Sequence, residues 1–389
     1  SNLRGIVLDP FVGSGTTVIE ALSAGQEEIG IDVDPVACLI ARVQTRKYDT
    51  AWLSRLLSHT ITEIDELEAS LKQAHLEEEE IIPGFSFSAN GLTAVVPDHP
   101  KIDFWFAPTH RAVLATLAAY LRELDDERAR DIFALSISSS IVRKWPNTLS
   151  LAMDIDHSRP HRADPEITEI SEQFDLFRRV FRTSVRVLID LAERSTVWPG
   201  EGRIIEGKSE NKMLDMDAES IDLVLTSPPY VNAIDYPRSH KFSEWWLSPQ
   251  ERNCRRSNYV GLRSVGRDYD LIDNFYAIAP QTTSALSWLR KDKYKPKSRK
   301  VFRYVNDMED IIAGCFHVLR REGKLVFILA NNRVAGKVIP LVDIIKEMLR
   351  LQGFENVSSE SRHIEPSRRR YPFGFEGPMK EEFIITADR

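Results

Sequence analysis

Apolar residues in the first part of the chain occur in short runs that alternate with segments of helical spacing. The run GIVLDPF at residues 5–11 predicts a buried strand. A glycine-rich turn follows it, and residues 16–24 have the spacing of a helix that Gly25 ends. Residues 28–34, EIGIDVD, predict a second buried strand, and Pro35 is a residue tolerated at the first position of a helix. The order strand, turn, helix, strand, helix predicts the first half of a parallel, doubly wound α/β sheet.

The sheet pattern is then interrupted by a long segment with helical spacing. Residues 51–80 predict one long polar helix, and residues 81–108 predict a loop rich in proline and aromatic residues. Residues 109–145 and 165–195 predict further helices. We therefore interpret residues 51–200 as a mainly helical insertion, which either reads a target or forms a buttress or dimer surface.

The sheet pattern resumes in the second half of the chain. The predicted strands are residues 203–206, 221–226, 324–329, 354–360 and 382–386, and the predicted helices are about 308–319 and 340–351. The segments that would build the sheet are residues 1–50, 201–248 and 305–389. Between the last two, residues 249–304 are turn-rich and predict a basic, mobile loop.

Charge is unevenly distributed along the chain. The net charge of −7 argues against nucleic-acid binding over the whole surface. Residues 231–305 nevertheless hold 15 Lys and Arg against 7 Asp and Glu, whereas residues 51–80 hold 2 against 8. A protein that binds a polyanion on one face can be acidic elsewhere. The basic segment therefore predicts contacts with DNA phosphates, with an ordinary solvated loop as the alternative.

The cysteines and the apolar runs bear on the cellular setting. The three cysteines are far apart and no CxxC pair occurs, which predicts neither a disulfide framework nor a zinc site and fits a reducing cytoplasm. We find no signal peptide and no apolar run long enough to span a bilayer. The chain opens with Ser1 and Asn2 and enters a strand almost at once, so we expect native sequence to be missing upstream.

The motif DPFVGSGTT at residues 9–17 lies between a predicted strand and helix. At such a turn the backbone approaches a ligand closely, and only glycine avoids a steric clash. No lysine follows the second glycine, so the turn is not a P-loop, and it does not match GxGxxG. Asp32 ends the next strand, where a doubly wound fold hydrogen-bonds the ribose of a nucleoside cofactor. The plainer interpretation is a strand-to-helix turn beside a solvated aspartate.

The motif TSPPY at residues 226–230 follows another buried strand. Two consecutive prolines fix a rigid, extended backbone, and the carbonyls of such a loop can accept hydrogen bonds from an amino group. Tyr230 offers a flat face to a base. Taken alone, Pro-Pro-Tyr is more often a structural corner or a peptide ligand than a catalytic site.

The two motifs together resemble those of the DNA amino-methyltransferases, which methylate N6 of adenine or N4 of cytosine. In that family the DPFxGSGT element is the cofactor loop, and Asp, Asn or Ser before Pro-Pro and an aromatic residue is the catalytic loop. The resemblance implies a Rossmann-like class I sheet with a large helical insertion, S-adenosylmethionine as cofactor and no metal. It also implies double-stranded DNA with a flipped target base as the partner.

The resemblance also implies which residues form the site. The predicted cofactor-binding residues are Asp9, Pro10, Phe11, Gly13, Ser14, Gly15, Thr16, Asp32 and Ser209. The predicted catalytic residues are Ser227, Pro228, Pro229 and Tyr230. The amino group would donate to the Ser227 side chain and the Pro228 carbonyl, and Tyr230 would stack on the base. Serine at the first loop position favours N4 of cytosine, and the lack of a Pro-Cys pair disfavours methylation of carbon 5.

The chain departs from the family pattern at two places. Members usually carry a further cofactor-binding segment just before the glycine turn, where this chain has only a few residues. They often have an acidic residue after the third strand, where residues 206–209 read EGKS and make Ser209 the candidate.

Three functions remain open from the sequence. The first is a DNA methyltransferase, for which the modification half of a restriction or defence system is one setting. The second is an RNA or tRNA guanine N2-methyltransferase, which usually prefers an acidic residue before the prolines. The third is a non-catalytic subunit of a defence system that binds S-adenosylmethionine or DNA.

Overall fold

The computed structural model describes residues 5–143, 147–153, 169–231, 236–247, 258–261, 268–290, 295–334, 336–364 and 381–389. The chain forms two compact units. The core unit comprises residues 1–41, 198–234 and 254–389, and the helical unit comprises residues 42–197 and 235–253. None of the helices in the described ranges combines the length and the apolar content that crossing a bilayer requires.

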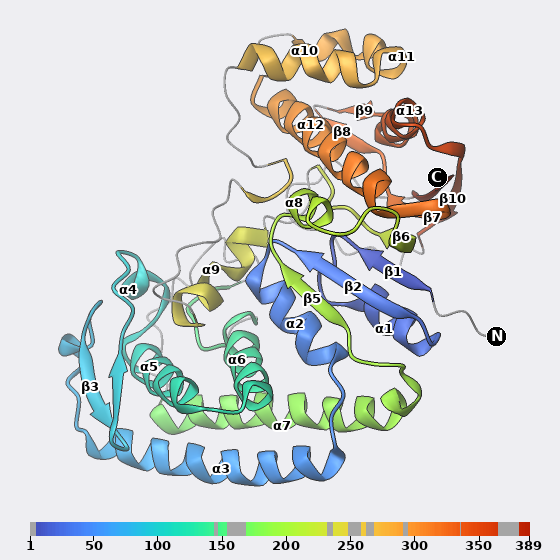
Figure 1. Cartoon of the computed structure of the whole chain (residues 1–389). Coiled ribbons are helices and arrows are strands. Elements are labelled where there is room, and N and C mark those ends of the chain that lie inside the picture. Colours follow the sequence, from blue (N-terminus) through green and yellow to red (C-terminus); the bar gives the residue numbers. More distant parts are fainter. Residues whose placement is uncertain are drawn as a thin grey trace. The chain divides into compact units, whose positions relative to one another are not determined.

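A seven-stranded sheet forms the centre of the core unit (Figure 1). Its order is β5-β2-β1-β6-β7-β11-β10, in which the first five strands are parallel and β11 runs antiparallel to both of its neighbours. The strands are β1 (Ile6–Asp9), β2 (Glu27–Asp32), β5 (Arg203–Glu206), β6 (Ile221–Thr226), β7 (Leu319–Leu329), β10 (Glu355–His363) and β11 (Glu381–Asp388). The predicted α/β architecture with a doubly wound, mostly parallel sheet is confirmed.

The helices of the core unit follow the strands in sequence. They are α1 (Thr16–Ser23), α8 (Ser209–Leu214), α10 (Asp268–Ile278), α11 (Pro280–Thr283), α12 (Lys295–Val318) and α13 (Leu341–Gln352), with a 3-10 segment at Ser284–Arg290 and a small hairpin of β8 (Asn332–Val334) and β9 (Lys337–Ile339). Helix α2 (Pro35–Thr45) begins in this unit and ends in the other. Leu8 and Val224 of the sheet belong to one apolar core with Ile311 of α12 and Ile345 of α13.

The predicted loop at residues 249–304 is wrong for most of its described part. Helices α10 and α11 lie in it, and α12 begins at Lys295 rather than near Met308. Val301 and Phe302 are buried whereas Arg299 and Lys300 are exposed, because α12 is amphipathic. Residues 248–257, 262–267 and 291–294, which carry much of the predicted DNA-contacting charge, lie outside the described residues.

The helical unit contains most of the predicted insertion. Its helices are α3 (Thr50–Gln73), α4 (Ile102–Trp105), α5 (Pro108–Glu123), α6 (Glu127–Ile141), α7 (Ile170–Arg194) and α9 (Tyr236–Leu247), with 3-10 turns at Glu78–Glu80 and Ser195–Val197. The predicted loop at residues 81–108 is wrong in part, because β3 (Ser86–Ala89) and β4 (Leu92–Val95) form a hairpin there. Arg178 of α7 forms ion pairs with Asp65 and Glu68 of α3, which fixes these two long helices against each other (Figure 1).

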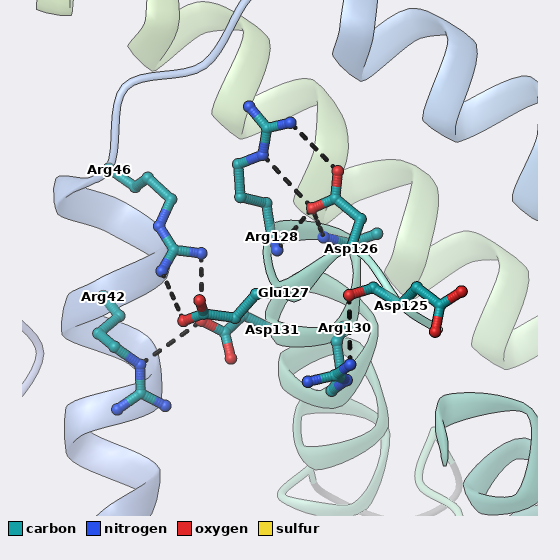
Figure 2. Close-up of polar contacts among 9 residues, drawn as sticks. Arg42, Arg46, Asp125, Asp126, Glu127, Arg128, Arg130 and Asp131 are labelled. Carbon is teal, nitrogen blue, oxygen red and sulfur yellow. Dashed lines mark hydrogen bonds and ion pairs between the residues drawn. The ribbon is translucent and has the colours of Figure 1, made fainter. Parts of the chain in front are cut away.

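An ion-pair cluster holds the end of α2 against the start of α6 (Figure 2). Asp131 lies 3.5 Å from Nε of Arg42 and 3.3 Å from Nη1 of Arg46. A second nitrogen of Arg46 contacts Glu127 at 3.0 Å. Burial raises the pKa of Asp131, and the two guanidinium groups partly oppose that shift. Removing either partner of such a half-buried pair leaves an uncompensated charge, so the cluster fixes the last turns of α2 to α6 within the helical unit.

Candidate functional site

The glycine turn between β1 and α1 presents backbone to a ligand. Gly13 and Gly15 have φ angles of 49° and 88°, in the left-handed region that glycine adopts without a steric penalty. Gly15 is the N-cap of α1, and no side chain caps the helix there. Ser14 and Thr16 on either side are exposed. The first-turn N–H groups and the helix dipole therefore suit an anionic group of a bound molecule.

Asp32 lies at the carboxyl end of β2 beside that turn. One carboxylate oxygen accepts from the Gly13 N–H at 2.9 Å, and the other accepts from the Asp34 N–H at 3.0 Å. Burial raises the pKa of Asp32 to about 6, although these hydrogen bonds act in the opposite direction. A carboxylate offers about four acceptor positions. The backbone bonds therefore orient Asp32 and leave it capacity to accept hydrogen bonds from hydroxyl groups.

Asp9 connects the glycine turn with the TSPPY loop, residues 226–230. Its Oδ1 accepts from the Thr226 hydroxyl at 2.5 Å and from the Phe11 N–H at 3.0 Å. Burial raises the pKa of Asp9, while bonds from Thr226 and Thr17 lower it. Because β1 and β6 are parallel neighbours, their carboxyl ends meet at one edge of the sheet. The structure thus brings the two sequence motifs together, and it uses the Asp9 side chain to join them.

The segment after β5 is attached to the same turn. The buried hydroxyl of Ser209 donates to the Pro10 carbonyl, and the Gly207 N–H donates to the carbonyl of Asp32 at 2.8 Å. Ser209 is therefore next to the glycine turn. Direct contacts of Pro10, Phe11 and Ser209 with a cofactor stay predictions.

The side chains of the TSPPY loop are fixed by the neighbouring strands. The exposed Ser227 hydroxyl donates to the carbonyl of Ile328 in β7 at 3.2 Å. The Tyr230 hydroxyl donates to Oε1 of Glu382 in β11 at 3.1 Å. Pro228 is buried and Pro229 is half-buried between them. The loop therefore presents Ser227 outward while its two ends are held by hydrogen bonds.

Four polar residues that support this site are not predicted from the sequence. Tyr259 donates to Asp34 at 3.1 Å, and Asp34 caps α2 by accepting from two backbone N–H groups. Glu382 is bound by Arg362 as well as by Tyr230. The Asp-Pro sequence at positions 34–35 is a recognisable helix start, whereas no local pattern marks the other three.

A carboxyl group lies buried on the same strand as Asp32. Glu28 of β2 is 3% exposed, and neither side-chain oxygen has a hydrogen-bond partner in the part of the chain that the structure describes. Burial, together with the charge of Asp9, raises the pKa of Glu28 to about 9. Glu28 is therefore protonated and neutral at pH 7, because an unpaired buried carboxylate would be far more costly.

We expect the stability of the protein to fall as pH rises from about 5 to 9. The folded state keeps a proton on Glu28, whereas the unfolded chain releases it above the ordinary pKa near 4.5. Glu28→Gln removes the ionisation, so it should be similar in stability to wild type at pH 5 and more stable at pH 8 by about 4 kcal/mol. Urea unfolding at both pH values measures this difference. Glu27→Gln, at the exposed neighbouring position, is the control. An equal pH slope for wild type and Glu28→Gln would contradict the assignment.

Comparison with known proteins gives one family match and several relatives. A family model for N6/N4 methyltransferases, described as DNA methylase, matches residues 1–43. The chain is 24% identical over 371 residues to the type II methyltransferase M.MvaI of Kocuria varians, covering 93% of this chain and 77% of that protein. It is 21% identical over 381 residues to the type II methyltransferase M.BsoBI of Geobacillus stearothermophilus, covering 86% and 70%.

A solved structure from Thermus thermophilus, provisionally named a DNA modification methylase and complexed with S-adenosyl-L-methionine, is also similar. Its sequence identity is 18% and its TM-score is 0.25, over 47% of this chain and 53% of that one. So low a TM-score does not define the fold, which rests on the strand order given above.

Proposed function

We propose that the chain is a DNA amino-methyltransferase. It would transfer a methyl group from S-adenosylmethionine to an exocyclic amino group in double-stranded DNA, with N4 of cytosine preferred over N6 of adenine. The observation that carries the proposal is the hydrogen bond of 2.5 Å between Asp9 and Thr226, which joins the glycine turn to the catalytic loop. The relatives are type II methyltransferases. Their names support the modification half of a restriction system as the setting.

The glycine turn and Asp32 fit the proposed cofactor. Asp32 has acceptor capacity left for the two ribose hydroxyls, and its backbone bonds hold it in place. The uncapped start of α1, at Gly15 and Thr16, suits the carboxylate of the methionine part. When bound, S-adenosylmethionine would supply a methyl group on a positively charged sulfur. Displacement by the base nitrogen would break the sulfur–methyl bond, leave a neutral thioether and release one amino proton to water.

Ser227 and Tyr230 would act on the flipped base. The Ser227 hydroxyl gives its proton to the carbonyl of Ile328, so the lone pairs of its oxygen remain available to accept from the amino group. Together with the Pro228 carbonyl, this would direct the nitrogen lone pair toward the methyl group. The Tyr230 ring would stack on the base. Positioning and electrostatics then lower the barrier without a covalent intermediate.

The preference for cytosine N4 rests on the resemblance, in which serine at the first position of the loop favours N4 of cytosine. A serine accepts one hydrogen bond from the amino group and places no negative charge beside the base. Asp or Asn at this position favours N6 of adenine in the family that the chain resembles. The preference is therefore a proposal about Ser227 alone.

A tritium-transfer assay tests the proposal. The protein is incubated with tritiated S-adenosylmethionine and either unmethylated genomic DNA or tRNA, and the labelled nucleoside is identified by mass spectrometry. We expect N4-methylcytosine from DNA, and no label with Ser227→Ala. N6-methyladenine would overturn the cytosine preference, and label in tRNA alone would overturn DNA as the substrate. A protein that binds the cofactor but labels neither substrate would overturn the catalytic proposal.

A further inference from the structure

A carboxylate on the last strand of the sheet holds the hydroxyl of Tyr230. Oε1 of Glu382 accepts from the Tyr230 hydroxyl at 3.1 Å. Its other oxygen, Oε2, accepts from Nε and Nη2 of Arg362 at 2.8 and 2.6 Å. The two oxygens are thus divided between the arginine and the tyrosine. Charge-assisted hydrogen bonds of this kind are stronger than neutral ones. Arg362 therefore fixes the carboxylate that accepts the hydrogen bond from the Tyr230 hydroxyl.

The pairing of β10 with β11 places these groups. Arg362 and Glu382 are direct cross-strand partners, so their side chains lie on the same face of the sheet. The Glu382 side chain is only 13% exposed, whereas that of Arg362 is 62% exposed. The carboxylate is therefore largely shielded from solvent, whereas most of the arginine that binds it is exposed.

The neighbouring strand anchors the other end of the catalytic loop. Ile328, whose carbonyl accepts from Ser227, is paired with Ile384, and Glu382 lies two residues before Ile384 on β11. Both functional side chains of the loop are thus bonded to adjacent, antiparallel strands. A shift of β11 along β7 would move the Glu382 anchor relative to the Ile328 anchor.

We propose that Glu382 is a positioning residue for methyl transfer, which holds the Tyr230 ring in the orientation needed to stack on the target base, and that Arg362 holds Glu382. This inference rests on the proposed function of the catalytic loop. A tyrosine without a fixed hydroxyl can rotate about its side-chain torsions. Losing the bond therefore lowers the fraction of molecules with the ring in place, and turnover falls while cofactor binding is unaffected.

A double-mutant cycle tests the assignment in the full chain. Wild type, Tyr230→Phe, Glu382→Ala and the double variant are assayed with tritiated S-adenosylmethionine and unmethylated genomic DNA. We expect each single substitution to lower kcat by about tenfold, and the double variant to lie within about twofold of the singles, because both remove the same bond. Affinity for S-adenosylmethionine and the melting temperature should stay at wild-type values.

Two further variants separate positioning from a structural role. Glu382→Gln keeps an oxygen that can accept from Tyr230, so it should restore most of the turnover that Glu382→Ala loses. Glu381→Ala changes the exposed neighbour at the start of β11 and should leave kcat unchanged.

Three outcomes would overturn the inference. The first is a double variant about 100-fold slower than wild type, since multiplied effects mean that the two residues act independently. The second is a parallel loss of cofactor affinity and melting temperature in Glu382→Ala. The third is full turnover in Tyr230→Phe. If wild type transfers methyl groups but the variants give one of these three outcomes, the proposed function stands and only the role of Glu382 is overturned. If wild type transfers no methyl group, both the proposed function and the role of Glu382 are overturned.

Discussion

Replacing Tyr230 with alanine should lower kcat for methyl transfer by about 100-fold or more, while the Kd for S-adenosylmethionine changes by less than about threefold. The substitution removes the flat face on which the base would rest, and stacking of one base on an aromatic ring contributes roughly 1–3 kcal/mol. The groups proposed to bind the cofactor, at Gly15 and Asp32, lie at the ends of other strands and are unchanged. Steady-state tritium transfer and equilibrium cofactor binding measure the two quantities.

Tyr230→Phe is the matched control for this experiment, because it keeps the ring and removes only the hydroxyl bond to Glu382. Its kcat should lie between those of wild type and Tyr230→Ala. If cofactor affinity fell as steeply as turnover in Tyr230→Ala, the proposed separation between a cofactor loop and a catalytic loop would be wrong.

The second large effect is expected at Asp32, whose replacement by alanine should raise the Kd for S-adenosylmethionine by about 100-fold. The variant loses the acceptor for the ribose hydroxyls and also the bonds that shape the turn at Gly13 and Asp34. Isothermal titration calorimetry measures the affinity. Glu27→Gln at the exposed start of the same strand should bind as wild type does.

The pH dependence of cofactor binding provides a check on the same residue. Because the pKa of Asp32 is raised to about 6, the carboxylate is ionised at pH 7.5 and becomes protonated as pH falls through 6. Protonation removes acceptor capacity, so affinity should weaken by up to about tenfold for each pH unit below 6. Asp32→Asn does not ionise and should lack this step. A wild-type affinity that is constant between pH 7.5 and 5 would show that Asp32 does not bind the ribose.

The sequence predicts the sheet well where its strands are short apolar runs bounded by glycine or proline. The strands β1, β2, β5 and β6 are close to their predicted positions, since each is followed by a clear break. The sequence pattern misses the start of β7 at Leu319, because the polar residues RREGK separate it from the apolar run that marks the strand. Pairing with a neighbouring strand, which no local pattern reports, extends it.

Two predicted loops fold into regular structure for identifiable reasons. The hairpin of β3 and β4 turns at Asn90 and Gly91, whose φ angles of 50° and 73° are those of a tight hairpin turn. Asn-Gly is a strong hairpin signal, so this element is predictable. The first half of α12 is not predicted from the sequence, because lysines and arginines dominate its composition. Val301, Val305 and Met308 nevertheless form a buried helical stripe.

Some residues of the candidate site could be predicted from local sequence, and others could not. Ser227, Tyr230, Asp32 and the glycine turn lie in local motifs, and parallel strands bring such motifs to one edge of a sheet. Glu382 and Arg362 are separated by 20 residues and become neighbours only through the β10–β11 register. That register is a tertiary property, so no inspection of either segment alone could have assigned them to Tyr230.

The bond between Asp9 and Thr226 has a consequence for how the two substrates would affect each other. A single carboxylate is shared by the loop proposed for the methyl donor and the loop proposed for the acceptor base. A shift of one loop on binding would then act on the other through this side chain as well as through the pairing of β1 with β6. Coupling between two binding sites is reciprocal. If the cofactor raises the affinity for DNA by some factor, DNA raises the affinity for the cofactor by the same factor. Asp9 would then be a thermodynamic link between the two ligands, even though it need touch neither of them.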